Sequence, residues 1–208
     1  MKVLLINGSC HANGCTFTAL SETAQALEKE GIQTEIIQLD AAPLRDCVAC
    51  NACRKLNNRC VFNDDIVNKI LEKAETADGF IFGSPVYYAH PSGRILSLMD
   101  RLFYAGGRVF AHKPAAAVVS ARRAGTTAAL DAIQKHFTLS QMPVVSSVYW
   151  NMVHGNTAEQ VKEDSEGLQI MRTLGRNMAW LLKCIAAGKK AGVALPEPEE
   201  RVWTNFIR

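Results

Sequence analysis

The residues that combine a reactive type with regular spacing are four of the seven cysteines. Cys47, Cys50, Cys53 and Cys60 follow the pattern C-x2-C-x2-C-x6-C. Two-residue gaps place successive sulfurs on one side of a tight loop, and four thiolates are the usual ligands of a [4Fe-4S] cube or a structural zinc ion. Zinc ribbons more often pair two separated C-x2-C motifs. The pattern therefore favours an iron-sulfur cluster, with zinc, or free or oxidised thiols, as alternatives.

A second candidate site is the loop of residues 8–16, GSCHANGCT, between an apolar run and a helical pattern. Such a loop directs backbone N–H groups and a helix N-terminus at one point, which suits a phosphate. It is not a Walker A loop, because Cys15 stands where the lysine would reach a triphosphate. Ser9, Thr16 and His11 suit a monophosphate such as that of FMN, whereas the alternative is a turn that only caps the helix. The helix N-terminus would also favour a Cys15 thiolate.

A third candidate is the segment 83–91, GSPVYYAHP, which follows another apolar run. An isoalloxazine ring needs flat apolar or aromatic contact and a few amides at its polar edge. Pro85, Val86, Tyr87 and Tyr88 offer both, and packing of the tyrosines at a strand end is the alternative. Ligands of doubly wound sheets bind at the carboxyl ends of strands near the switch point. We therefore expect this segment to lie beside the first loop.

The segment 120–127, SARRAGTT, precedes a helical pattern and forms a further loop at the same edge. Arg122 or nearby amides could stabilise negative charge on a reduced flavin. A solvated basic turn with a threonine cap is the alternative.

The pattern of apolar residues predicts the elements that must position these loops. We expect strands at 2–8, 33–38, 79–83, 115–119 and 143–149. We expect helices at 16–30, 64–76, 92–104, 125–138 and 158–188. Alternating strands and helices, with strands that are apolar throughout, predict an α/β fold with a doubly wound, five-stranded parallel sheet and helices on both faces. We expect one domain over 1–208, with a Cys-rich insertion at about 40–63 and a docking tail at about 192–208.

Composition narrows the function classes. The chain is 48% hydrophobic and 21% charged, as in soluble globular proteins, and its longest apolar runs are strand-sized, so we expect no membrane span. A net charge of +3 without a long basic run argues against nucleic acid as a partner. The first residues do not resemble a signal peptide, so we expect a cytoplasmic protein whose cysteines serve metal or redox chemistry.

The segments GSCHANGCT, ADGFIFGSPVYYAHPSG and LMDRLF, in this order, resemble the flavodoxin-like NAD(P)H-dependent FMN reductases. The cysteines, between the second strand and the next helix, resemble the motif of the iron-sulfur flavoprotein branch. The resemblance implies a flavodoxin-like fold, FMN, and NAD(P)H as co-substrate, with the first loop on the phosphate and the SPVY segment along the flavin. Members usually have Arg or Lys near His11 and Asn or Ser at the position of Cys15, so this chain departs from the pattern at its phosphate contacts.

We therefore expect an FMN-dependent NAD(P)H oxidoreductase that passes electrons to a small acceptor such as a quinone, a flavin, or an azo or nitro compound. If a [4Fe-4S] cluster is present, single electrons can also leave and ferredoxin becomes a candidate partner. The flavin carries the chemistry, so no side chain is assigned as catalytic. The expected cofactor contacts are Ser9, His11, Asn13, Gly14, Cys15, Thr16, Ser84, Pro85, Val86, Tyr87, Tyr88, Ser120, Arg122 and Gly125. The expected metal ligands are Cys47, Cys50, Cys53 and Cys60.

The same resemblance implies a homodimer or homotetramer. Two other functions stay open. One is an electron carrier like flavodoxin, which the positive net charge disfavours. The other is a redox or metal sensor that uses the four-cysteine loop.

Overall fold

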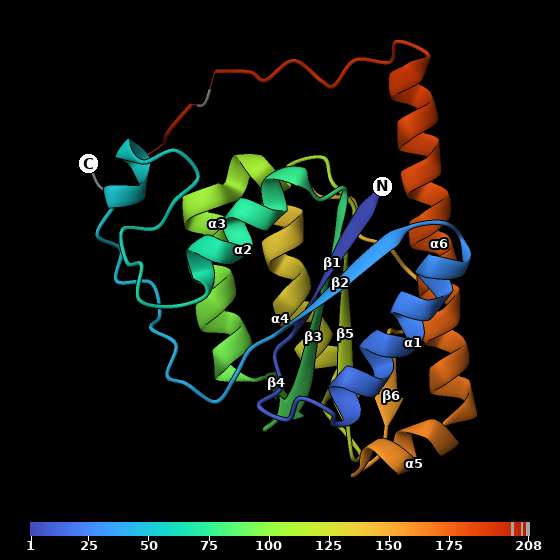
Figure 1. Ribbon diagram of the computed structural model, residues 1–208. Coiled ribbons are helices and arrows are strands. Elements are labelled where there is room, and N and C mark those ends of the chain that lie inside the picture. Colours follow the sequence, from blue (N-terminus) through green and yellow to red (C-terminus); the bar gives the residue numbers. More distant parts are fainter. Residues whose placement is uncertain (201, 205, 207–208) are drawn as a thin grey trace.

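A computed structural model describes residues 1–200, 202–204 and 206. The strands are β1 (Lys2–Asn7), β2 (Gln33–Gln38), β3 (Gly79–Tyr87), β4 (His90–Pro91), β5 (Ala115–Ala121) and β6 (Met152–His154). The helices are α1 (Cys15–Lys29), the 3-10 helix η1 (Ala52–Lys55), α2 (Val67–Thr76), α3 (Gly93–Phe110), α4 (Thr126–Leu139), α5 (Ala158–Glu163) and α6 (Ser165–Lys190). Figure 1 shows the helices on both sides of the sheet.

The sheet order is β2-β1-β3-β5-β6, with every pair in this path parallel, and the two-residue β4 pairs antiparallel with β3. The order reverses between β1 and β3, because the chain crosses from β2 over β1 to reach β3. In sheets of this kind the loops after the two strands at the switch point form a ligand crevice. The prediction of a doubly wound parallel α/β sheet is confirmed, and the sixth strand is the short β4.

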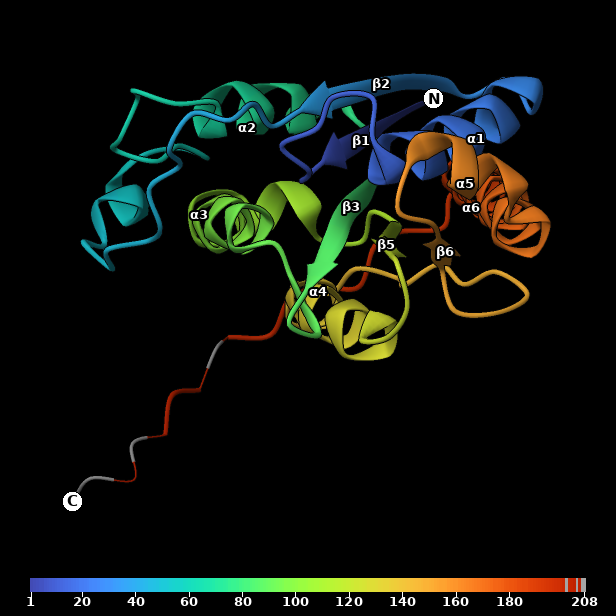
Figure 2. The same cartoon turned by 90° about the horizontal axis from the view of Figure 1, so that it is seen from below.

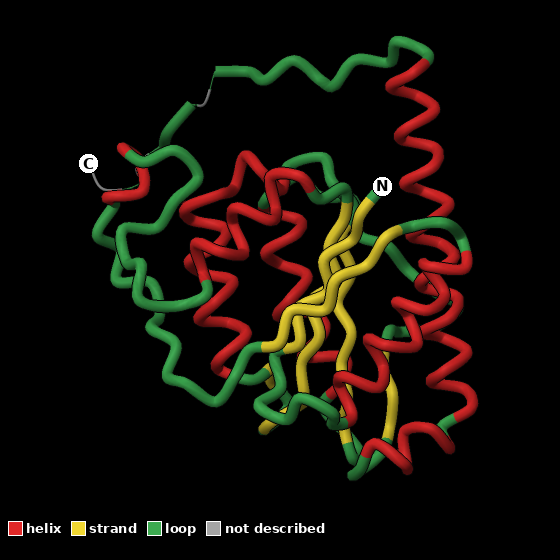
Figure 3. Tube along the Cα trace, in the orientation of Figure 1, coloured by secondary structure: helices red, strands yellow, loops and turns green. Residues whose placement is uncertain are grey.

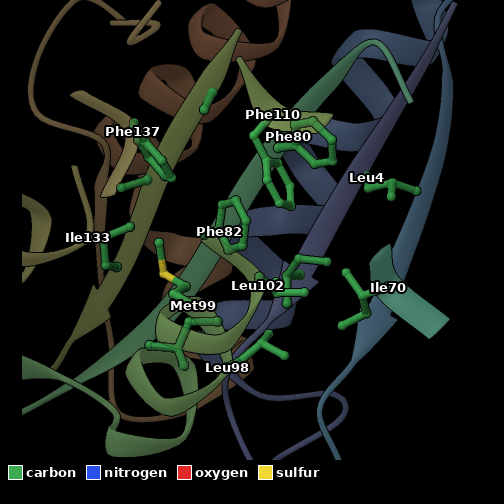
Figure 4. Close-up of a cluster of buried hydrophobic side chains, with 14 of the residues drawn as sticks. Leu4, Ile70, Phe80, Phe82, Leu98, Met99, Leu102, Phe110, Ile133 and Phe137 are labelled. Atoms are coloured by element: carbon green, nitrogen blue, oxygen red, sulfur yellow. The ribbon is translucent and has the colours of Figure 1, made fainter. Parts of the chain in front are cut away.

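Alternate side chains of each central strand enter different cores. In β1, Leu4 and Ile6 face the core under α2, α3 and α4, whereas Leu5 faces the core under α1 and α6. Figure 4 shows the first of these cores, where Phe80 and Phe82 of β3 lie among side chains of α3 and α4. Because side chains of a strand alternate with a period of two, a strand covered on both faces must be apolar throughout.

The predicted fifth strand at 143–149 is wrong in position. Within that range only Val144 forms an isolated bridge, to Ala115, and the paired strand is β6 at Met152–His154. The hydroxyl of Ser147 donates to the Tyr149 carbonyl at 2.6 Å and bonds to Asn151 Oδ1 at 2.7 Å. These local side-chain bonds turn the chain away from the sheet before it can continue as a strand.

The predicted long helix at 158–188 is divided into α5 and α6. Asp164 lies between them, and its Oδ1 accepts a hydrogen bond from the Gly167 amide at 2.9 Å, as an N-cap does. Its Oδ2 accepts from the His154 amide at 2.7 Å. One carboxylate therefore begins α6 and ties it to the end of β6.

The segment from Leu39 to Ile66 connects β2 to α2 and contains only η1 as regular structure, as Figure 3 shows. At the other end, residues 192–200 have no regular structure, and Val202 and Phe206 of the expected docking tail are exposed. The expected tail residue Ile207 lies outside the described residues. None of the helices among the described residues is both long and apolar enough to cross a membrane.

Candidate functional site

The first loop, residues 8–14, is held by polar side chains of the strands beneath it. Asn7 Oδ1 accepts from the Ser9 amide at 3.1 Å, and Asn7 Nδ2 donates to Gln38 Oε1 at 2.5 Å. Gln38 Nε2 donates to the Ser9 carbonyl at 2.6 Å, and Ser9 Oγ accepts from the His11 amide at 3.1 Å. The ends of β1 and β2 therefore fix the shape of the loop. The sequence predictions missed Asn7 and Gln38, although a polar Asn7 at the end of the apolar run 3–6 was the available signal.

The loop leads into α1 at an open N-terminus. Gly14 is the N-cap, with extended backbone, and among the described residues no side chain caps the first turn. Thr16 is buried in that turn, and its hydroxyl lies 2.8 Å from the hydroxyl of Ser120 at the end of β5. The free N–H groups and the positive end of the helix dipole make this position suitable for an anion.

Two glycines show how closely the other loops approach. A Cβ on Gly8 would lie 2.8 Å from the Gly83 carbonyl oxygen, and the Gly8 amide donates to that oxygen at 2.8 Å. Gly125, with a φ of +93°, precedes α4, and a Cβ there would lie 2.7 Å from Ala89 Cα. The loops after β1, β3 and β5 therefore meet at one end of the sheet, the end that Figure 2 views from below.

The segment after β3 forms a hairpin with β4. Tyr88 and Ala89 have positive φ angles of 51° and 61°, the left-handed conformation that two-residue hairpin turns require. Tyr88 is fully exposed and Tyr87 is half exposed. Partial burial and the nearby Cys10 raise the pKa of Tyr87 while Arg94 lowers it, so this phenol lies beside the first loop.

Ser84 serves the hairpin from inside the protein. Its fully buried hydroxyl donates to the Pro85 carbonyl and accepts from the Ser92 amide, both at 2.8 Å. Ser92 Oγ in turn donates to the Gly8 carbonyl at 2.9 Å and caps α3. Ser84 and Ser92 therefore connect the hairpin to the first loop. The role of Ser84 in this structure is to position these loops.

The other residues predicted as cofactor contacts lie around this meeting point at different depths. Ser9, Thr16 and Ser120 are buried, and Gly14, Cys15, Pro85, Val86 and Gly125 are half-buried. The exposed members are His11, Asn13, Tyr87, Tyr88 and Arg122.

The expectation of a favoured Cys15 thiolate is wrong. Burial raises the pKa of Cys15, and its Sγ donates to the Gly155 carbonyl at 3.6 Å. The helix N-terminus is close, but loss of water around the sulfur outweighs its effect.

The four predicted metal ligands line one pocket, together with Phe62, Arg101 and Tyr104 among others. Cys60 is buried, Cys47 and Cys53 are half-buried, and Cys50 is exposed. Burial raises the pKa of Cys53, and electrostatic interaction with the other three cysteines raises it further, so the four sulfurs share one electrostatic environment. Among the described residues, no three His, Cys, Asp or Glu side chains converge tightly enough to hold a metal ion. The thiols are gathered at one pocket without closing into a ligand sphere.

Cys60 is the most firmly held of the four. Its amide donates to Asn68 Oδ1 at 2.9 Å, and its carbonyl accepts from Asn68 Nδ2 at 3.0 Å. Arg101 Nη2 lies 3.5 Å from its Sγ, and the Arg101 side chain is almost fully buried. Arg101 also pairs with Asp65, yet its buried Nε has no partner among the described residues. A buried cation with a spare N–H group suits a centre made of negatively charged thiolates.

Residues 1–157 match the family model described as NADPH-dependent FMN reductase. The chain belongs to this family. Within the FMN reductase family it falls in the iron-sulfur flavoprotein branch, because an iron-sulfur flavoprotein of Methanocaldococcus jannaschii is 34% identical over 196 residues, covering 89% of this chain and 99% of that protein. An iron-sulfur flavoprotein of Methanosarcina thermophila is 26% identical and covers 89% of this chain and 97% of its own.

Solved structures support the fold of this FMN reductase. A flavone reductase superposes with a TM-score of 0.68 at 20% identity, over 89% of this chain and 64% of its own. An archaeal flavodoxin superposes with a TM-score of 0.59 at 17% identity, over 88% of this chain and 99% of its own. The flavodoxin-like fold is therefore confirmed, and family membership makes the protein an FMN-dependent oxidoreductase.

Proposed function

We propose that the protein binds FMN where the loops after β1, β3 and β5 meet, and catalyses electron transfer from NAD(P)H to a small acceptor. When bound, the flavin supplies hydride and electron-transfer chemistry. The observation that carries the proposal is the buried Thr16–Ser120 hydroxyl pair at the uncapped N-terminus of α1. It combines open N–H donors, hydroxyls and a helix dipole at the place where a phosphate would bind.

The first loop would bind the phosphate through its amides. Residues 8–14 are already fixed by Asn7 and Gln38, so little further ordering is needed on binding. Thr16 would donate to a phosphate oxygen while Ser120 orients its hydroxyl. The loop lacks Lys and Arg, which favours a monophosphate over a more highly charged ligand.

The hairpin would position the flavin ring. Pro85, Val86 and Tyr87 offer an apolar edge beside the first loop, and the turn at Tyr88 and Ala89 sets the angle of that edge. The exposed Arg122 and the amides before α4 would stabilise negative charge on the reduced ring. No side chain needs to act as a nucleophile.

The four-cysteine pocket is proposed as a [4Fe-4S] site with Cys47, Cys50, Cys53 and Cys60 as ligands. Supporting observations are the shared pocket, the buried Arg101 and the names of the relatives. Such a centre would let electrons leave one at a time, with ferredoxin as a candidate partner.

The proposed chain assembly is a homodimer or homotetramer. Trp150 packs edge-on against Tyr149 with ring centroids 4.9 Å apart, yet both rings are half exposed, and Trp180 of α6 is also exposed. Large exposed aromatic groups commonly mark protein contacts. Light scattering of the purified protein should give two or four chains, and a monomer at micromolar concentration would contradict this.

Steady-state oxidation of NADH and NADPH with a quinone tests the function. We expect turnover that disappears when FMN is removed and returns when FMN is added. A protein that binds FMN without turnover would instead be an electron carrier. A protein without flavin, whose partner binding follows cysteine oxidation, would be a sensor, and either result would contradict the proposal.

A further inference from the structure

Among the described residues, Arg101 is the one buried charged side chain, and it joins α3 to a proposed metal ligand. The side chain is 1% exposed, and Nη2 donates to Cys60 Sγ at 3.5 Å. Nη1 contacts Asp65 and the Arg45 carbonyl, the latter at 3.3 Å, and Nη2 also donates to the Phe62 carbonyl at 3.4 Å. The guanidinium therefore holds both ends of the cysteine-rich segment as well as one sulfur.

A second arginine of α3 also contacts the cysteine-rich segment. Arg94 lies seven residues earlier, hence on the same face of the helix, and donates to the carbonyls of Asp40, Ala41 and Ala42. Arg94 thus holds the start of the cysteine-rich segment without touching a cysteine. Arg94 therefore only anchors the segment, whereas Arg101 also contacts a cysteine sulfur.

The positive charge of Arg101 is balanced by a carboxylate on one side only. Asp65, 12% exposed, neutralises the guanidinium on one side, and the ring of Phe62 lies 5.7 Å from it. Cys60 Sγ occupies the other side, and Nε still lacks a partner among the described residues. The buried guanidinium therefore has an unused N–H donor for a centre that becomes more negative on reduction. Hydrogen bonds to sulfur and nearby charges set the reduction potentials of iron-sulfur centres.

We propose that Arg101 is a positioning residue for the iron-sulfur centre, which fixes Cys60 as its preformed corner and raises its reduction potential. The inference rests on the proposed cluster. Cys60 is held at its backbone by Asn68 and at its sulfur by Arg101, whereas Cys47, Cys50 and Cys53 lie on a more exposed stretch. Cys60 would hold the centre as its preformed ligand, and the loop that carries the other three cysteines would adjust around it.

The variants that test the proposal separate charge from geometry. Arg101→Lys keeps a positive charge but loses the planar fork. Arg101→Gln combined with Asp65→Asn removes the charge without leaving a buried carboxylate unpaired. Arg45→Gln is the matched control, because the Arg45 guanidinium lies over the same Phe62 ring at 4.3 Å and pairs with Asp64, but its side chain is exposed and contacts no cysteine in the described residues.

The measurements are FMN, iron and sulfide per chain after anaerobic purification, and the midpoint potential of the centre by redox titration followed by electron paramagnetic resonance. We expect full FMN content in every variant. We expect a lower potential and reduced iron content in the Gln/Asn double variant, a smaller change in Arg101→Lys, and wild-type values in Arg45→Gln.

Three results would overturn the inference. The double variant could match the wild-type potential and iron content, the Arg45 control could shift as much as Arg101, or the Arg101 variants could lose FMN together with iron, which would mark a general role in folding. A wild-type protein that holds FMN but neither iron nor sulfide would instead contradict the proposed cluster itself. The wild-type sample thus separates the two failures.

Discussion

At the scale of single residues, the hydroxyls of Thr16 and Ser120 are the most sensitive probes of the proposed FMN site. They come from α1 and β5 and lie 2.8 Å apart in a buried position. Thr16→Val keeps the volume but removes one donor, so FMN affinity should fall on the order of tenfold, the effect of losing a hydrogen bond to a charged group. Fluorescence titration with FMN measures it.

The matched control is Thr23→Val on the same helix. Thr23 is also buried, but its hydroxyl donates only to the Ala19 carbonyl within α1. Its variant should bind FMN like the wild type. Equal losses in both variants would show that the effect comes from α1 stability and would contradict the assignment of Thr16.

Gly125 tests the contact between the hairpin and the loop after β5. Its φ of +93° is a left-handed conformation, and an added Cβ would lie 2.7 Å from Ala89 Cα. Gly125→Ala should lower the free energy of unfolding by at least about 1 kcal/mol. Gly107→Ala in α3, where a Cβ would meet no atom within 4 Å, should be neutral or stabilising. Urea unfolding compares the two, and an unchanged Gly125 variant would contradict the tight contact.

Residue types and spacing were enough to predict that the first loop lies beside the segment 83–91 and that the four cysteines gather at one pocket. They were not enough for Asn7, Gln38 and Arg101, which contact partners 29 to 41 residues away. The pattern of the last helix likewise does not show that Cys184 is exposed. Apolar neighbours in the sequence do not show which face of a helix packs against the rest of the protein.

At the scale of elements, α3 carries the cysteine-rich segment on one face. Arg94 donates to three successive carbonyls at the start of that segment. Arg94→Gln should speed amide hydrogen exchange in residues 40–46, because local opening becomes cheaper when these contacts are lost. Arg172→Gln, which removes an ion pair to Glu22 at the other face of the sheet, should leave exchange in this segment unchanged. No difference between the two variants would contradict the anchoring role.

The elements with strong periodicity were predicted within a few residues, including α1, α4 and β2. The strand at 143–149 was misplaced, because the bonds of Ser147 to Tyr149 and Asn151 are specific to side chains that a propensity pattern does not weigh. The break between α5 and α6 was missed for a similar reason. An aspartate can cap a helix or lie within one, and it is the contact of Asp164 with the His154 amide that makes it the start of α6 here.

At the scale of the whole molecule, the free energy of unfolding should depend on pH, in part through an ion-pair cluster on the edge strand β2. Glu35 of β2 bonds to Lys2 of β1 and Lys73 of α2, at 2.6 and 2.7 Å, and these hydrogen bonds, with the lysine charges, lower its pKa. Its contribution is fully present above the unfolded-state pKa of about 4.3 and is lost as pH falls through the lower folded-state value. The side chain is 30% exposed, so the contribution is at most about 1 kcal/mol.

Glu35→Gln should therefore lower the free energy of unfolding at pH 7 and shrink the difference in that free energy between pH 7 and pH 3. Urea unfolding at both pH values measures it. Glu197→Gln in the exposed tail changes net charge equally and serves as control. A Glu35 variant with the wild-type pH dependence would contradict the role of this cluster.

The most direct test of the whole account is a titration of the flavin-free protein with FMN and, separately, with riboflavin, followed by flavin fluorescence. If α1 and its loop bind the phosphate, FMN should bind at least about a hundredfold more tightly, because two charge-assisted hydrogen bonds of roughly 1.5 kcal/mol each are lost with riboflavin. Equal affinity for the two flavins, or binding of neither, would contradict the phosphate site on which the proposed oxidoreductase depends.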